Sequence, residues 1–231
     1  MSRIIKVARM QLINKWTFVG IPLIILAGSF LFTLAIWYLV RRGGAEGILY
    51  GGGAQAPMWY FLALGIQALT LTFPFAMAMS VSRRSFYLGT VALFAGCALI
   101  LSVFYYLMGL LEVATGGWGV DGRFFALQWI AGNNWLIQIL FYFMLMLVLF
   151  MIGFFAATLY MRWRTTGVLV FSIGLGLLLL GAVALITLSD SWLEVGRWLA
   201  AWTAAGATGL GACLAVLLAG SSYLTLRKTT A

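Results

Sequence analysis

Hydrophobic and polar positions form long blocks along the chain. Six apolar blocks follow one another, and none contains Asp, Glu, Lys, Arg or His in its interior. A helix needs about 20 apolar residues to cross a bilayer core roughly 30 Å thick, so each block is long enough for one span. The pattern predicts an all-α membrane protein with six transmembrane helices in one domain over 17–231. We expect the spans at 17–40, 58–81, 87–111, 135–160, 167–188 and 203–223.

Composition supports this prediction and narrows the possible chemistry. Of the 231 residues, 64% are hydrophobic and 8% are charged, which is more apolar surface than a soluble domain of this length can bury. The chain has no histidine and no G-x-x-x-x-G-K-[ST] motif. We therefore expect no catalytic, cofactor or metal site, and no ATP hydrolysis by the chain itself.

The segment before the first span combines apolar and basic positions. As a helix it would carry apolar side chains on one face and mainly polar and basic ones opposite, which is typical of a helix lying on an anionic membrane surface. The alternative is that it is only the basic flank of the first span. The apolar face comprises Ile5, Ala8, Leu12 and Trp16, opposite Arg3, Lys6 and Asn14. We predict an interfacial amphipathic helix over 1–16.

The distribution of the net charge of +9 predicts the orientation in the membrane. Loops 41–57, 112–134 and 189–202 carry all five acidic residues, whereas loops 82–86 and 161–166 are short and basic. Cytoplasmic segments of membrane proteins are enriched in Lys and Arg, so we predict that both termini and the two short loops are cytoplasmic. The cations of these inner segments are Arg3, Lys6, Arg9, Lys15, Arg83, Arg84, Arg162, Arg164, Arg227 and Lys228.

Two spans have features of their own. Pro74 lies deep in the second span, where a missing N–H kinks a helix; we predict a hinge there, with a merely tolerated proline as the alternative. The last span has small residues at every fourth position, which permit close packing of another helix. That helix belongs to the same chain by default and to a second copy in the alternative. The small residues are Ala205, Gly209 and Cys213, and Ala207, Gly211 and Ala215.

The longer loops contain structural signals. Ser191 and Glu194 have the spacing of a capping box, which predicts a short amphipathic helix before the last span. Loop 112–134 carries several large apolar side chains among glycines, typical of an aromatic belt at the headgroup level, with a substrate gate as the alternative. These side chains are Trp118, Phe124, Phe125, Trp129 and Ile130.

The hairpin Met79–Gly89, MSVSRRSFYLG, is a short basic turn between two apolar blocks. Together with the basic start, the second hairpin over 160–167 and the amphipathic segment before the last span, it resembles the six-span permease subunits of bacterial ABC-2 type exporters, also called type V ABC transporters. The resemblance covers nearly the whole chain. Arg164 stands where this family is expected to favour glycine.

The resemblance implies an exporter in the bacterial plasma membrane. Two permease chains, identical or paralogous, would assemble with two copies of a separate ABC ATPase subunit that binds ATP and Mg. The permease chains would lie in the lipid membrane, and no nucleic acid would bind. The coupling segment would be Ser82, Arg83, Arg84, Ser85 and Phe86, with Phe86 as a protruding ring. Arg162 and Arg164 would form the second cytoplasmic loop. The path between the second and fifth spans of the two chains would lie near Gln67, Thr70, Phe73 and Phe171.

Two other functions are consistent with the same residues. A non-transporting membrane scaffold or assembly factor explains the absence of charged residues within the spans equally well. A secondary carrier for an apolar solute is a further alternative, although proton-driven carriers usually keep an ionisable residue at the midplane. Without the family resemblance, Arg83 and Arg84 would only set the topology.

Overall fold

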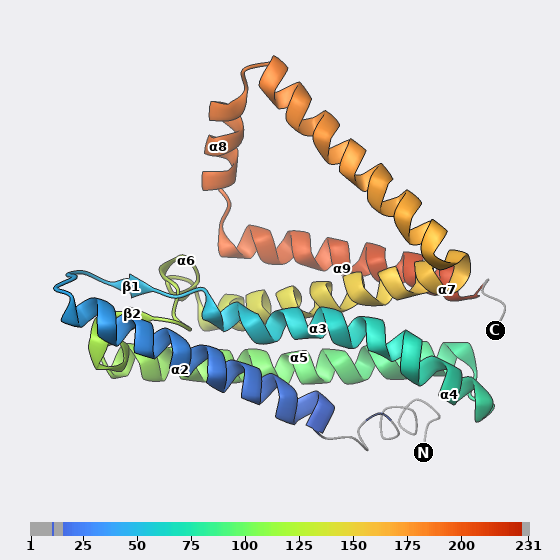
Figure 1. Ribbon diagram of the computed structural model, residues 1–231, viewed down its shortest axis with the longest axis horizontal. Helices are drawn as coiled ribbons and strands as arrows, with labels where there is room; N and C mark the ends of the chain where they lie inside the picture. The colour runs from blue at the N-terminus through green and yellow to red at the C-terminus, as the bar shows by residue number, and fades with distance from the viewer. Residues whose placement is uncertain (1–10, 12–15, 228–231) are drawn as a thin grey trace.

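The computed structural model describes residue 11 and residues 16–227. The chain forms long helices that run back and forth side by side (Figure 1). Within this described part of the chain, five helices are long and apolar enough to cross a membrane. This confirms a mainly helical, membrane-embedded protein. The predicted interfacial helix over 1–16 lies outside the described residues except for Gln11 and Trp16.

The first two spans each contain a π-helical turn. The five-residue segment η1 (Trp16–Gly20) precedes α2 (Ile21–Arg42). The second span consists of the short 3-10 segment η2 (Gly53–Gln55), α3 (Ala56–Gln67), the π-helical segment η3 (Ala68–Thr72) and α4 (Phe73–Ala78). Pro74 lies in the first turn of α4, where its missing N–H costs least. The hinge at Pro74 stays a prediction.

The third span is longer than predicted. Helix α5 (Arg83–Ala114) begins at the predicted basic hairpin, because Ser82 adopts an extended conformation and caps the first turn. At its other end the helix continues past the predicted end of the span and includes Glu112. Arg83, Arg84 and Glu112 therefore belong to the helix instead of the predicted loops.

Helix α7 (Trp135–Leu188) has 54 residues, but its backbone is not helical at Arg164 (φ 56°, ψ −154°). At 1.5 Å per residue, a straight helix of this length would be about 80 Å long, more than twice a bilayer core. The half before Arg164 packs in the bundle, and the half after it leaves the bundle at a steep angle (Figure 1).

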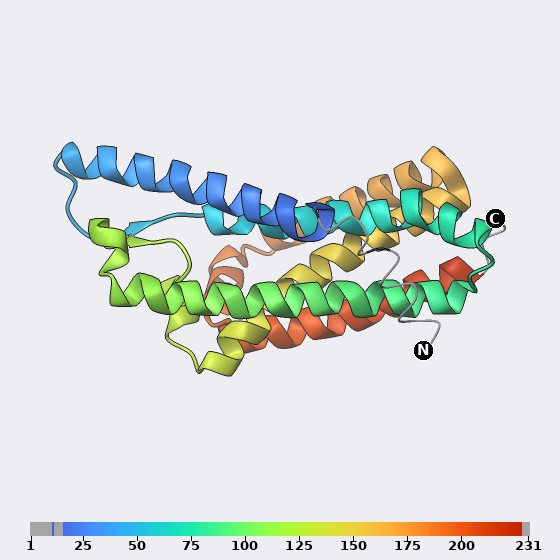
Figure 2. The same cartoon turned by 90° about the horizontal axis from the view of Figure 1, so that it is seen from below.

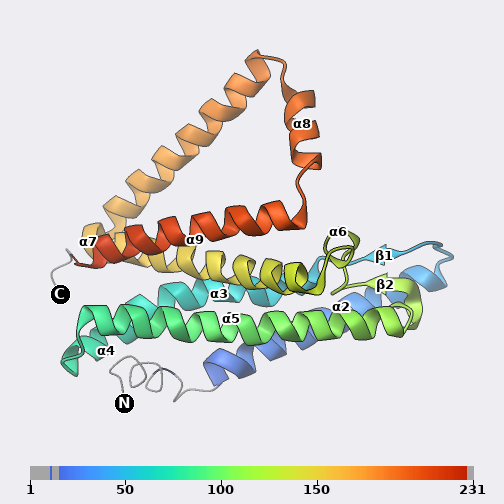
Figure 3. The ribbon, with the colours of Figure 1, turned by 180° about the vertical axis from the view of Figure 1, so that it is seen from behind.

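The chain returns through two further helices. Figure 3 shows that the second half of α7, α8 (Trp192–Ala200) and α9 (Ala204–Arg227) form the three sides of an open triangle. Helix α8 confirms the predicted short helix, but Ser191 makes no capping bond and its hydroxyl donates to the Ser189 carbonyl oxygen at 3.2 Å. The predicted capping box is therefore not formed.

Glycines permit a close helix crossing between α3 and the first half of α7. A Cβ added at Gly65 would overlap the Phe150 carbonyl oxygen, and one added at Gly153 would overlap the Leu62 carbonyl oxygen. Only glycine on both helices permits this contact between backbones. The second span and the first half of α7 therefore form the centre of the bundle.

Helix α9 uses one of its two small-residue faces for packing. Ala215 is buried and Ala207 and Gly211 are half-buried, with an added Cβ at Gly211 lying 3.4 Å from Met144 of α7. The other face is exposed and comprises Ala205, Gly209 and Cys213. Packing within the chain accounts for the first face.

Residues 43–55 and 115–134 fold together into what we call the cap. It contains η4 (Gly117–Asp121), α6 (Gln128–Ala131) and a two-stranded parallel pairing of β1 (Leu49–Tyr50) with β2 (Gly122–Arg123). Figure 2 shows the cap at the end of the bundle opposite the turn between α4 and α5. Two of the three predicted outer loops therefore lie together at one end of the molecule.

Candidate functional site

The basic hairpin is a tight, capped turn. Ser80 has a positive φ of 58°, and the Ser82 hydroxyl oxygen accepts a hydrogen bond from the Ser85 backbone N–H at 3.2 Å. The two hydroxyl oxygens of Ser82 and Ser85 lie 2.8 Å apart. Arg84 is exposed and Arg83 is half-buried. The start of α5 is thus a stiff element that presents a guanidinium group at the surface.

Phe86 does not protrude, contrary to the prediction. Its side chain is completely buried, and its ring packs edge-on against Phe73 with a centroid separation of 5.2 Å. Phe86 is one turn into α5, on the side that faces α4, so burial against the second span removes it from the surface. It is unable to insert into a partner and instead connects the hairpin to the residue before Pro74.

The four predicted path residues have different surroundings within one chain. Gln67 lines a cavity, and Phe73 is buried against Phe86. Thr70 is exposed, with its hydroxyl donating to the Ile66 carbonyl oxygen at 3.0 Å. Phe171 lies on the second half of α7, and the centroid of its ring is 5.6 Å from that of the Phe155 ring. The single chain does not bring the four side chains together.

The second basic hairpin is a bend within α7. The Arg162 guanidinium lies 4.4 Å from the centroid of the Trp163 ring, a cation–π contact. Arg164 has φ 56° and ψ −154°, a conformation that is essentially restricted to glycine. This is the position where the family resemblance led us to expect glycine, and the backbone geometry supplies the physical reason. Trp163 and Phe171 also line an open surface cavity of about 450 Å³ beside this bend.

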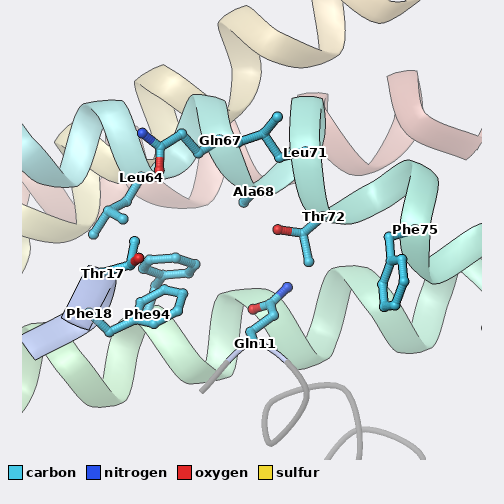
Figure 4. A pocket seen from close by; sticks show the side chains of 10 residues that line it. All are labelled: Gln11, Thr17, Phe18, Leu64, Gln67, Ala68, Leu71, Thr72, Phe75 and Phe94. Carbon is cyan, nitrogen blue, oxygen red and sulfur yellow. The ribbon is translucent and has the colours of Figure 1, made fainter. Parts of the chain in front are cut away.

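A cavity of about 440 Å³ lies between η1, η3, α5 and Gln11. Phe18 and Phe94 are at one end and Phe75 is at the other (Figure 4). Gln11 is 6% exposed, and its side-chain N–H donates to the Thr90 hydroxyl oxygen at 2.8 Å. The lining residues are Gln11, Thr17, Phe18, Leu64, Gln67, Ala68, Leu71, Thr72, Phe75 and Phe94.

Glu112 holds the cap through a buried carboxylate. It is completely buried and accepts hydrogen bonds from the backbone N–H groups of Phe124, Phe125 and Ala126 at 2.8–3.0 Å and from the Trp118 indole N–H at 2.9 Å. A buried polar group is costly unless it is hydrogen-bonded, and four hydrogen bonds offset much of the cost of burying this one. Sequence reasoning assigned Glu112 to a loop because it directly follows the predicted span.

The aromatic residues of the cap pack inside the protein, so the predicted belt at the membrane surface is wrong for most of them. Phe124 and Phe125 are buried, with ring centroids 5.2 Å and 5.9 Å from Phe30 of α2. Tyr105 and Tyr142 donate hydrogen bonds from the membrane helices to cap carbonyl oxygens at 2.6 Å and 2.7 Å. The cap is therefore anchored to three helices.

Arg41 connects the two segments of the cap. Its guanidinium donates to the carbonyl oxygens of Ala45, Gly47 and Val120 at 2.7–3.0 Å and pairs with the Asp121 carboxylate at 2.8 Å. A planar guanidinium with several donors suits this arrangement.

The described residues contain no group of three or more His, Cys, Asp and Glu that could hold a metal ion.

Comparison with known proteins identifies no relative: no family model, no curated protein and no solved structure matches the chain.

Proposed function

We propose that the chain is the membrane-spanning subunit of an ATP-driven exporter of the ABC-2 type, with six spans and both termini in the cytoplasm. The turn between α4 and α5, the bend of α7 and the end of α9 lie together at one end of the bundle (Figure 1). These are the segments whose cations occur without acids in the sequence. The break at Arg164 divides α7 into two halves, each long enough for one span.

The observation that carries the proposal is the contact between the hairpin and the second span. A partner that binds at Arg84 would act on the first turn of α5, which Ser82 caps. Phe86 in the next turn packs against Phe73, and Pro74 follows immediately. Displacement of the hairpin is therefore transmitted through packed rings to the second span, the task that a coupling element of an exporter performs.

The exposed second half of α7 supports assembly with a second permease chain. Its apolar side chains are exposed around the whole helix, including Val170, Leu178 and Leu185 at 66–70%. A transport path built from the second span of one chain and the fifth span of another would bring Gln67 and Phe171 into one environment. The single chain keeps them apart, which fits a path that forms only on assembly.

The test is co-purification with an ATPase subunit. The tagged chain is co-expressed with P-loop ATPases encoded next to its gene, purified in mild detergent and assayed for ATP hydrolysis. The proposal predicts an ATPase subunit in about equal amount and hydrolysis that depends on the hairpin. Arg84→Glu should abolish the stimulated hydrolysis, whereas Arg42→Glu, an exposed arginine at the cap end, should leave it unchanged.

The two alternative functions predict different outcomes. A scaffold or a secondary carrier would elute without an ATPase subunit, or with one whose activity ignores both substitutions. Either result would overturn the exporter proposal and leave the hairpin arginines as topology signals. Size-exclusion profiles of both variants confirm that the proteins remain folded.

A further inference from the structure

We infer that a cavity in the cap binds the carboxylate group of a small organic acid with an apolar body. The cap lies at the end of the bundle opposite the turn between α4 and α5 (Figure 2), so this inference does not depend on coupling to an ATPase. It rests on a guanidinium group without an acidic partner, on a second donor beside it, and on the apolar part of the lining. The lining includes Ile48, Tyr50, Val113, Arg123, Ala126 and Gln128.

The first observation is the Arg123 side chain. It is half-buried, and its guanidinium forms no hydrogen bond or ion pair among the described residues. All five acidic residues of the chain lie within the described part, and the one nearest to Arg123 in sequence, Asp121, pairs with Arg41. Residues 1–10, 12–15 and 228–231 contain no Asp or Glu. No acidic side chain of this chain therefore pairs with Arg123, and its donors are left for an anion from outside.

The second observation is that the backbone holds Arg123 in a fixed place. Arg123 lies in β2 directly beside Tyr50 of β1, and its carbonyl oxygen accepts a hydrogen bond from the Gly51 N–H at 3.1 Å. The next residues of the chain, 124–126, are bound by the Glu112 carboxylate. A donor whose backbone is already ordered loses less conformational entropy when a ligand binds. The guanidinium is therefore prepared for binding.

The third observation is a second donor in the same lining. The Tyr50 hydroxyl donates to Gln128 Oε1 at 2.9 Å, which orients the amide group. The Gln128 Nε2 has no hydrogen-bond partner among the described residues and remains a donor. Arg123 and Gln128 together suit a group that only accepts hydrogen bonds, and a planar guanidinium matches a carboxylate with two parallel bonds. One guanidinium balances one negative charge, so a monocarboxylate fits better than a dianion.

The size and the opening of the cavity define the rest of the ligand. Its volume of about 270 Å³ is just below the range of roughly 300–1,000 Å³ that is usual for small-molecule sites, so the ligand is small. Ile48 and Val113 line the cavity and are each 53% exposed, so it opens at the surface beside apolar side chains. A second cavity of about 540 Å³ shares Tyr50 and Gln128 and adds Trp129. A short apolar chain fits the first cavity, and a longer one would extend along these aromatic rings.

The experiment is photo-crosslinking of the purified full chain in phosphatidylcholine nanodiscs. The probe is octanoic acid with a diazirine in its chain, and the control probe is the matching octanol, which has the same chain without the charge. Adducts are mapped by mass spectrometry. We expect the acid to label residues 48–50 and 113–132 roughly ten-fold more than the alcohol does, because it adds a charge-assisted hydrogen bond. Unlabelled octanoate should compete, and unlabelled octanol should not.

Matched variants test the role of the guanidinium. Arg123→Gln removes the charge that lines the cavity, and Arg42→Gln makes the same change at an exposed arginine of the cap end, outside the lining. Arg123→Gln should weaken labelling by the acid roughly ten-fold and leave labelling by the alcohol unchanged. Arg42→Gln should leave both unchanged. Competition by octanoate and octanol on the wild-type chain keeps the test valid if Arg123→Gln lowers the yield.

The outcomes separate the two sources of such an acid. A fatty acid retained by the wild-type chain on purification from its host, and lost from Arg123→Gln, identifies the membrane as the source. Competition by hexanoate without any retained fatty acid identifies an acid dissolved in water. Three results would overturn the inference: equal labelling by both probes, labelling that octanoate does not reduce, and labelling by the acid that Arg123→Gln and Arg42→Gln affect alike.

Discussion

The cap end of the molecule and the half that contains the basic hairpin each bury a polar side chain. The two side chains differ in how many hydrogen-bond partners they have. At the cap end, Glu112 receives four hydrogen bonds. In the half that contains the basic hairpin, the Gln11 amide donates one hydrogen bond to Thr90, and its buried oxygen has no hydrogen-bond partner among the described residues. A buried group that is fully satisfied stabilises one arrangement, whereas a partly satisfied one is retained at a cost. The comparison separates a fully satisfied buried group from one that is retained at a cost.

The largest effect is expected from breaking the cap. Glu112→Ala leaves three backbone N–H groups and an indole N–H without their acceptor, which should destabilise the protein by about 3 kcal/mol or more. The midpoint of thermal unfolding in detergent and the rate of proteolysis within 115–134 measure this loss. Glu46→Ala is the matched control, because Glu46 is exposed on the same cap. Equal midpoints for both variants would show that Glu112 does not hold the cap.

A gain of stability is expected from Arg164→Gly. Arg164 occupies a conformation that costs a residue with a Cβ about 1–3 kcal/mol, and glycine relieves most of it. Arg162→Gly, two residues earlier in a helical conformation, should instead cost about 1 kcal/mol. Thermal unfolding of the two variants compares them directly. A lower midpoint of thermal unfolding for both variants would mean that the bend at Arg164 is not strained.

Replacing a hydrogen-bonded glutamine should have unequal effects at the two ends. Gln138 donates to the Ala131 and Asn133 carbonyl oxygens at 3.2 Å and 2.7 Å, so Gln138→Leu should cost about 2 kcal/mol. Gln11→Leu loses one hydrogen bond but also removes an unpaired buried oxygen, so its cost should stay below about 1 kcal/mol. Thermal unfolding again provides the measurement. A larger loss of stability for Gln11→Leu than for Gln138→Leu would contradict the comparison between the two ends of the molecule.

The smallest effect is expected at the exposed ion pair of the cap. The Asp121 side chain is 68% exposed, so Asp121→Asn should cost at most about 0.5 kcal/mol, and the cost should vanish in high salt. Arg41→Met should cost more, because three backbone carbonyl oxygens also lose their donor. Unfolding midpoints at low and high salt distinguish the two contributions.

Hydropathy alone predicted the helical membrane fold, and the breaks between apolar blocks located most helix ends. The residues after Ser191 predicted the short helix α8, although the capping box itself is not formed. The start of α5 after Ser82 was not predicted, because the apolar block begins only at Tyr87. Hydropathy did not reveal that Glu112 is buried, since its four donors come from residues up to 14 positions further along. Nor did it reveal that Phe86 is buried. An apolar residue near a helix end gives the same hydropathy signal whether it faces a partner protein or a neighbouring helix of its own chain.

The apolar blocks and the segregation of charge between loops follow from residues close together in the chain, so both are evident before the chain is folded. The packing of one face against another depends on the folded structure. Folding brought Gln11 to Thr90, 79 residues away, and placed η1 and η3 on opposite sides of one cavity. The physical reason is that lipid and protein interiors are equally apolar, so hydropathy shows which residues leave water but not which residues they meet.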